Sequence, residues 1–324
     1  MISELMKDFK KVDVTKMRSA DFLQRQDEIE RHKLQEIEKG GRPWRDVTSC
    51  PVCGSMERVH ELVKHGIELV ACQSCGTRYG TKMADLDAIY KDPNYVSFSA
   101  DDTEEHFNYR RERFGRERVA ILEKYCGNLE QKRILDVGCG NGYFLSVASE
   151  KSKHCFGAEF SDKLRKFTEQ KTGCMVYDKT LDELPSEGFD IITLFDLIEH
   201  IPEPVPFMKS VDRILSPGGY ILIFTPVFDS FGIRVMGAYS SIVDPTEHVL
   251  LFTMSSLAFL GRELGYEIVY SETQGLDVAN ILAMRQFRNE PPDQIFVEFG
   301  NELQAIINAA GCGDYGRMMY RKPE

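Results

Sequence analysis

The chain has 324 residues, of which 42% are hydrophobic and 28% are charged. This composition excludes disordered, collagenous and fibrous proteins, and the length predicts one large domain with a smaller appendage. The sequence has no run of about 18 apolar residues and no apolar stretch typical of a signal peptide, so we expect a soluble cytoplasmic protein without a membrane partner. The formal net charge is −11, and the acidic excess lies in residues 101–324. Because nucleic-acid binders normally present a basic face, this balance disfavours a nucleic-acid partner.

Residues 1–45 predict a helical segment. The stretch Ser19–Lys39 is rich in charged residues, begins with a Ser/Asp cap signal and stops before Gly40. Its apolar residues Ile29, Leu34 and Ile37 indicate an amphipathic helix that lies across another surface.

Residues 46–85 contain two C-x2-C-G pairs, Cys50 with Cys53 and Cys72 with Cys75. The spacing C-x2-C-x18-C-x2-C is typical of a four-thiolate zinc site. The glycine after each pair lets the backbone turn, so that both sulfurs of a pair converge on one ion. We therefore predict a zinc ribbon in which a structural Zn²⁺ replaces the core that so short a segment cannot bury. Four thiolates leave no open position for catalysis.

From residue 86 to residue 324, helical patterns alternate with short apolar strands. The arginine-rich stretch 110–118 is interleaved with glutamates and predicts a solvated helix face. Alternating strands and helices are typical of an α/β protein with a doubly wound parallel sheet. The predicted strands are Arg133–Val137, His154–Glu159, Met175–Tyr177, Phe189–Phe195, Tyr220–Thr225, Tyr266–Ser271 and Gly316–Arg321.

The loop after the first of these strands carries a ligand-binding signal. In R-I-L-D-V-G-C-G-N-G-Y the strand ends at Asp136, and three glycines let the backbone turn sharply and approach a ligand. A dinucleotide loop has a further glycine where this chain has Tyr143, and Asp136 would repel phosphate and favour a cationic ligand. Glu159 ends the next strand, at the distance where a carboxylate accepts hydrogen bonds from both ribose hydroxyls. The glycines of the loop are Gly138, Gly140 and Gly142.

On these residues the sequence resembles the class I S-adenosylmethionine-dependent methyltransferases over roughly residues 90–324. With the cysteine pairs in front, it is similar to bacterial methyltransferases of sugars and small metabolites. The resemblance implies a seven-stranded Rossmann-like domain that binds S-adenosylmethionine and releases S-adenosylhomocysteine. Other stretches that carry it are F-D-I-I-T-L-F-D-L-I-E-H-I-P-E-P (189–204), R-I-L-S-P-G-G-Y-I-L-I-F-T-P (213–226), E-H-V-L-L-F-T (247–253) and L-G-Y-E-I-V (264–269).

The same resemblance implies roles for individual residues. The glycine loop would lie under the methionine part of the cofactor, Glu159 would hold the ribose, and Phe160 would lie against the adenine. Phe195 would approach the transferred methyl group. Asp178 is an alternative to Thr180 and Leu181 at the adenine edge. The full expected cofactor set is Asp136, Gly138, Cys139, Gly140, Gly142, Tyr143, Glu159, Phe160, Thr180, Leu181, Phe195 and Asp196.

The sulfonium is already an activated methyl donor, so the enzyme has to align an acceptor and often to remove its proton. Histidine has the best suited pKa for that at neutral pH. By resemblance to sugar C-methyltransferases, Glu247 and His248 serve proton transfer, while His200 is either catalytic or structural. Tyr95, in a predicted lid, would contact the acceptor. The insertion 227–246 is expected to cover the acceptor, and residues 285–315 to cover it or to build a homodimer.

The leading interpretation is therefore an enzyme that methylates oxygen or carbon of a sugar or another small metabolite. Two alternatives stay open. One is an RNA methyltransferase whose zinc ribbon grips the nucleic acid, against which the net charge argues. The other is a non-catalytic scaffold that binds the cofactor while its ribbon and helix hold a partner, against which the intact loop and Glu159 argue. Outside the ribbon we expect no carboxylate–histidine cluster that could hold a second metal.

Overall fold

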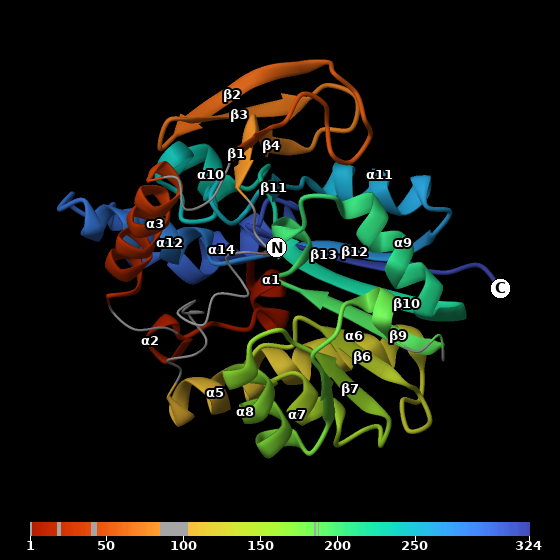
Figure 1. Cartoon of the computed structure of the whole chain (residues 1–324). Coiled ribbons are helices and arrows are strands. Elements are labelled where there is room, and N and C mark those ends of the chain that lie inside the picture. Colours follow the sequence, from red (N-terminus) through yellow and green to blue (C-terminus); the bar gives the residue numbers. More distant parts are fainter. Residues whose placement is uncertain (1, 18–20, 40–43, 85–102, 185, 187) are drawn as a thin grey trace.

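A computed structural model describes residues 2–17, 21–39, 44–84, 103–184, 186 and 188–324 (Figure 1). Its central sheet has seven strands in the order β12-β13-β10-β9-β6-β7-β8, in which β13 runs antiparallel between β10 and β12. The α/β class and each predicted strand are confirmed, although β10 begins earlier than predicted. The strands are β6 (Ile134–Val137), β7 (Cys155–Ala158), β8 (Met175–Tyr177), β9 (Phe189–Phe195), β10 (Leu215–Pro226), β12 (Glu267–Gln274) and β13 (Tyr315–Arg321).

Both faces of this sheet are covered, which explains why its central strands are apolar runs rather than alternating patterns. Successive strand residues point to opposite faces, so Ile134 packs under one helical layer and Leu135 under the other. The first layer contains α6 (Arg116–Cys126) and α7 (Leu145–Ala148), and the second contains α9 (Pro204–Ile214) and α11 (Met254–Glu263). The carboxyl ends of the parallel strands therefore form one polar edge between the two layers.

The other helices flank the sheet or cap that edge. A π-helical turn, η2, joins α5 and α6 into one continuous rod. Among the described helices, none combines the length and apolarity needed to cross a bilayer. The remaining helices are α1 (Ile2–Asp8), α2 (Val14–Met17), α3 (Phe22–Glu38), α5 (Glu104–Arg110), η2 (Arg111–Gly115), α8 (Asp162–Thr172), η3 (Leu181–Glu183), η4 (Ile198–His200), α10 (Phe231–Met236), η5 (Gly237–Tyr239), α12 (Asp277–Phe287), α13 (Gln294–Glu298) and α14 (Gly300–Ala309).

The cysteine-rich segment forms a small antiparallel sheet that the large domain completes. Its strands are β2 (Arg58–Lys64), β3 (Ile67–Cys72) and β4 (Arg78–Gly80), while β1 (Trp44–Asp46) pairs with β5 (Lys82–Ala84). The fourth strand of the sheet is β11 (Leu250–Leu251), which follows the insertion and pairs with β4. Ribbon residues such as Val70 and Tyr79 share the core cluster that contains α9 and α11. The ribbon therefore shares both a sheet and a hydrophobic core with the large domain.

The arginine-rich stretch is a solvated helix face only in part. Arg116 stays exposed and pairs with Glu112 and Glu150, but the side chains of Arg113 and Arg118 point inward. Arg113 lies within the π turn η2, whose wider winding also rotates the residues that follow it, such as Arg118, relative to a regular helix.

Candidate functional site

A cavity of about 1720 Å³ lies along the carboxyl ends of the parallel strands. It runs from the glycine loop, past the end of β9, to the insertion and α12–α14. Single-ligand pockets are typically ~300–1,000 Å³, so this cavity has room for two molecules side by side. This is the edge at which ligands bind in open α/β sheets.

The loop between β6 and α7 holds Glu159 in a defined orientation. The Glu159 carboxylate accepts hydrogen bonds from the backbone N–H groups of Gly140, at 3.1 Å, and Ser161, at 2.8 Å. Gly138 and Gly140 have positive φ values of 71° and 52°, which carry the backbone over the strand end. Burial raises the pKa of Glu159, and the two N–H donors oppose that effect. The carboxylate is thus fixed at the cavity wall beside the loop.

Asp136 lies at the floor of the loop and is buried. Its Oδ1 accepts a hydrogen bond of 2.6 Å from the Thr193 hydroxyl. Burial raises the pKa of Asp136 to about 7, although Thr193 and the cation of Arg118 favour the ionised form. A buried carboxyl that is costly to ionise is stabilised by a positively charged ligand in the adjacent cavity.

Arg118 is a cavity residue that the sequence interpretation missed. Its guanidinium is 4.0 Å from the centroid of the Phe195 ring and 3.7 Å from the Asp196 carboxylate. The side chain is 6% exposed and donates a hydrogen bond to the Tyr143 hydroxyl. Asp196 has a φ of 53°, which is uncommon outside glycine, and accepts a hydrogen bond from the Tyr315 hydroxyl. A fixed cation therefore stands at the end of β9, next to the glycine loop.

All of the predicted cofactor residues except Gly142 line the cavity. Gly142 faces α8 instead of the cavity, since a Cβ there would lie 2.5 Å from Cγ2 of Thr168. Tyr95, the predicted acceptor contact, lies outside the described residues. Those that line the cavity are Asp136, Gly138, Cys139, Gly140, Tyr143, Glu159, Phe160, Thr180, Leu181, Phe195 and Asp196.

The fold brings the two predicted histidines together in the wall of the cavity, just after the end of β9. The ring centroids of His200 and His248 are 4.9 Å apart. Nδ1 of His200 lies 3.1 Å from the backbone oxygen of Glu247, and Nδ1 of His248 lies 2.7 Å from that of Ile242. Because a carbonyl oxygen only accepts, each Nδ1 carries a proton, and each neutral ring keeps its basic lone pair on Nε2. Burial, reinforced by His248, lowers the pKa of His200 to about 3, so His200 is neutral at physiological pH.

Glu199 completes a cluster with the two histidines. Its side chain is 1% exposed and accepts a 2.9 Å hydrogen bond from the Thr225 hydroxyl. Glu199, His200 and His248 each offer one ligand atom, and these atoms lie within 4.8 Å of one another. The expectation of no carboxylate–histidine cluster outside the ribbon is therefore wrong, because the fold joins η4 to a residue beyond the insertion. Such a grouping can move a proton or hold a divalent cation.

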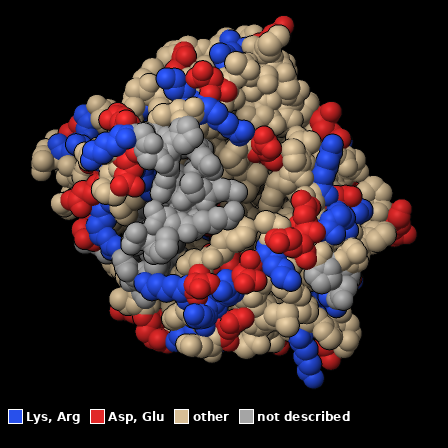
Figure 2. All heavy atoms as spheres, viewed as in Figure 1, with Lys and Arg blue, Asp and Glu red and all other residues tan. Residues whose placement is uncertain are grey.

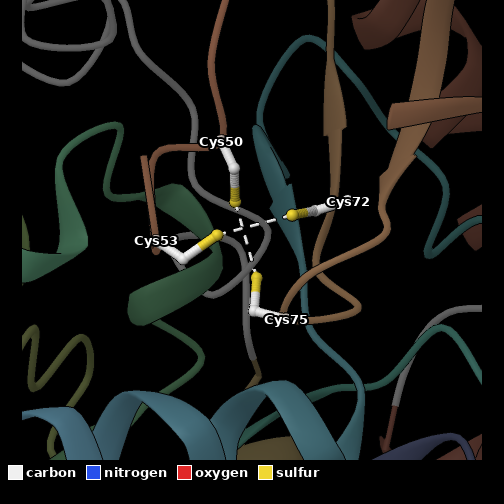
Figure 3. A group of neighbouring side chains, drawn as sticks. All are labelled: Cys50, Cys53, Cys72 and Cys75. Atoms are coloured by element: carbon white, nitrogen blue, oxygen red, sulfur yellow. Dashed lines mark hydrogen bonds between the residues drawn. The ribbon is translucent and has the colours of Figure 1, made fainter. Parts of the chain in front are cut away.

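The four ribbon cysteines also converge. Figure 3 shows their sulfurs pointing toward one another, with Sγ–Sγ distances of 3.5 Å between Cys50 and Cys75 and 3.4 Å between Cys53 and Cys72. Zn–S bonds of ~2.3 Å in a tetrahedron imply sulfur separations of ~3.8 Å. Gly54 and Gly76 follow the two pairs with positive φ values and close equivalent turns. The donor set and its geometry are compatible with a zinc ion.

Comparison with known proteins agrees with this geometry. The sequence model of a family described as a methyltransferase domain matches residues 106–271, about half of the chain. The chain belongs to this family and has the fold of a class I S-adenosylmethionine-dependent methyltransferase. The structure of magnesium protoporphyrin IX methyltransferase from Synechocystis PCC 6803 with bound SAH has a similar fold, with a TM-score of 0.50 and 13% identity over 74% of this chain and all of that one.

Curated relatives match a shorter region. The ubiquinone biosynthesis O-methyltransferase of Idiomarina loihiensis is 30% identical over 117 residues, which is 33% of this chain and 48% of that protein. The enzyme of the same description from Actinobacillus pleuropneumoniae serotype 7 is 27% identical over 145 residues, covering 41% and 59%. The chain thus spans about half the length of the curated relatives that it matches.

The cavity residues fit the methyl donor. Glu159 offers a fixed carboxylate for ribose hydroxyls, Asp136 favours a cationic sulfonium nearby, and Arg118 offers a cation for the methionine carboxylate. When bound, S-adenosylmethionine supplies an activated methyl group, and the chain's own residues have to orient it and prepare the acceptor.

Proposed function

We propose that this enzyme transfers the methyl group to a hydroxyl group of a small metabolite, such as a sugar, with His248 as the general base. The observation that carries the proposal is the histidine pair that lines the same cavity as the cofactor residues. The names of the similar O-methyltransferases support an oxygen acceptor. A cavity with room for a second molecule supports a small acceptor that lies fully inside it.

The two imidazoles have different roles in this proposal. The lone pair of His248 Nε2 accepts the proton of the acceptor hydroxyl as the oxygen attacks the methyl carbon. His200, whose pKa is lowered to about 3 by burial and by His248, stays neutral and avoids placing a second positive charge beside the protonated base. Their Nδ1–H donors to backbone oxygens hold both rings in the required tautomer. General-base catalysis of this kind contributes typically ~10²–10⁴-fold to the rate.

RNA as the acceptor has less support. Figure 2 shows Lys and Arg interspersed with Asp and Glu over the face in view. Arg111 and Arg116 of the arginine-rich stretch pair with Glu112 and Glu150, so their charge is locally balanced.

The test uses S-adenosylmethionine labelled on its methyl group, incubated with the enzyme and with separated small-molecule, glycan, protein and RNA fractions of a cell extract. We expect label in the small-molecule or glycan fraction, lost ~10²-fold or more in His248→Gln. His154→Gln, which changes an exposed histidine, is the matched control and should keep full transfer. Label confined to RNA, or transfer unchanged in His248→Gln, would contradict the proposal.

A further inference from the structure

The N-terminal helix α3 reaches the part of the cavity that the two histidines line, although it lies outside the region matched by the family. Phe22 and Gln26 of α3 line the cavity, and α3 lies beside α12 (Figure 1). The Gln26 side-chain amide donates a 3.0 Å hydrogen bond to the backbone oxygen of Ser241 in the segment that leads to His248. One face of α3 therefore lines the cavity beside residues 241–248, which we call the acceptor wall.

Helix α3 also forms an ion pair with the segment that leads to His248. The Lys33 ammonium group binds the Glu247 carboxylate, and each of the two side chains is only 11% exposed. Breaking a buried ion pair by removing one partner leaves the other charge uncompensated, which makes such a pair far more consequential than one on the surface. Burial disfavours ionisation of the nearby Asp244, yet Lys33 and His248 hold its pKa below the usual value. The Lys33 charge thus acts on more than one acid of the wall.

Glu247 connects Lys33 to both imidazoles. Its backbone oxygen accepts a hydrogen bond from the Nδ1–H of His200, and the next residue in the chain is His248. A contact that holds Glu247 in place therefore also holds the ring of His200, through this hydrogen bond, and the backbone of His248, through the peptide bond.

The ribbon anchors the same face of this helix one turn earlier, because residues three apart on a helix lie on one face. Glu30, which is 4% exposed, lies 3.1 Å from the Lys64 ammonium group and 3.0 Å from His65 Nε2. Lys64 ends β2, and His65 begins the turn that leads to β3, where it adopts a φ of 51°. The position of Lys33 is thus set by two successive turns of α3, one held by the ribbon and one by the acceptor wall.

We propose that Lys33 is a positioning residue of the active site, which through Glu247 sets the placement of His200 and His248. The acceptor site is then incomplete without the N-terminal helix, and the ribbon serves as the platform that holds this helix in place. The inference rests on the proposed function, because it assigns Lys33 to the same histidine pair.

The test compares Lys33→Met, Lys33→Arg and a control on the same helix, Arg31→Met, whose side chain is 69% exposed. We expect Lys33→Met to lower methyl transfer to the labelled fraction ~10–100-fold while the affinity for S-adenosylhomocysteine stays within twofold of wild type. Lys33→Arg should recover most of the loss, and Arg31→Met should behave as wild type. If Lys33→Met does not fold, Lys33→Gln keeps a hydrogen-bond donor for Glu247 and takes its place.

A second readout needs no acceptor. Imidazole Cε1–H NMR signals of His200 and His248, assigned with the His200→Gln and His248→Gln variants, should move in Lys33→Met and stay in place in Arg31→Met. Unmoved signals together with wild-type transfer would overturn the positioning role. Absence of label transfer by the wild-type enzyme, with the signals moving as expected, would instead overturn the proposed function and leave the structural link intact.

Discussion

Replacement of Asp136 by Asn should separate two effects of the buried carboxylate: the folding stability that its ionisation costs and the binding of a cationic cofactor that it favours. Asn keeps the shape and can still accept the Thr193 hydrogen bond. Burial raises the pKa of Asp136 from 3.8 to about 7. At ~1.4 kcal/mol per pKa unit, the ionised side chain therefore costs on the order of 4 kcal/mol of folding stability. Because the folded pKa is raised, the stability that Asp136 contributes is fully present below pH ~4 and is lost as the pH rises through about 7.

Urea unfolding of wild type and Asp136→Asn at pH 5, 6, 7 and 8 measures this effect. Between pH 5 and pH 8 the variant should gain ~2.5 kcal/mol on the wild type, because the remainder of the total effect of ~4 kcal/mol already appears between pH ~4 and pH 5. The variant should also bind S-adenosylmethionine more weakly at pH 8, of order tenfold, while S-adenosylhomocysteine, which lacks the sulfonium charge, is affected less. Asp46→Asn, at an exposed site, is the control. A stability difference that does not vary with pH would refute the reasoning about burial, and equal losses for both ligands would refute the role toward the sulfonium.

Three other perturbations follow from the structure. Cys72→Ser should release zinc, measured by atomic absorption, and remove a cooperative step from the calorimetric melt, because structural zinc supplies ~10–16 kcal/mol in small domains. An unchanged melt would count against a metal in the ribbon. Arg118→Met should weaken S-adenosylhomocysteine binding, measured by calorimetry, ~10-fold or more, whereas Arg116→Met, on the same helix, should not. Equal affinities of the two variants for this ligand would show that Arg118 is not part of the cofactor site. Gly142→Ala should destabilise by ~2 kcal/mol or more in chemical unfolding, and more than Gly173→Ala, which also has positive φ but open space around it; equal losses would mean that the close approach to α8 is not limiting.

The elements of the large domain were largely predictable from the sequence. Mainly apolar runs such as Ile134–Val137 and Phe189–Phe195 are local signals, because a strand buried on both faces needs apolar side chains at most of its positions. The positions of Glu159 and of the glycine loop follow as well, since the carboxyl ends of parallel strands meet at one edge. The cysteine spacing likewise predicted a convergence of four sulfurs, which the fold provides.

What only the tertiary structure decided are contacts between segments that are far apart in the chain. The approach of His200 to His248 and the pairing of β11 with β4 depend on how the insertion folds back, and no periodicity records that. The inward direction of Arg118 depends on one π turn, which a regular helical pattern cannot anticipate. The ion pair of Lys33 with Glu247 joins residues more than 200 positions apart, so either residue alone reads as an ordinary charged position. Local sequence therefore determined the sheet, the loop and the metal-binding pattern, whereas the acceptor end of the site arises from long-range packing, whose free energy is shared among many distant residues.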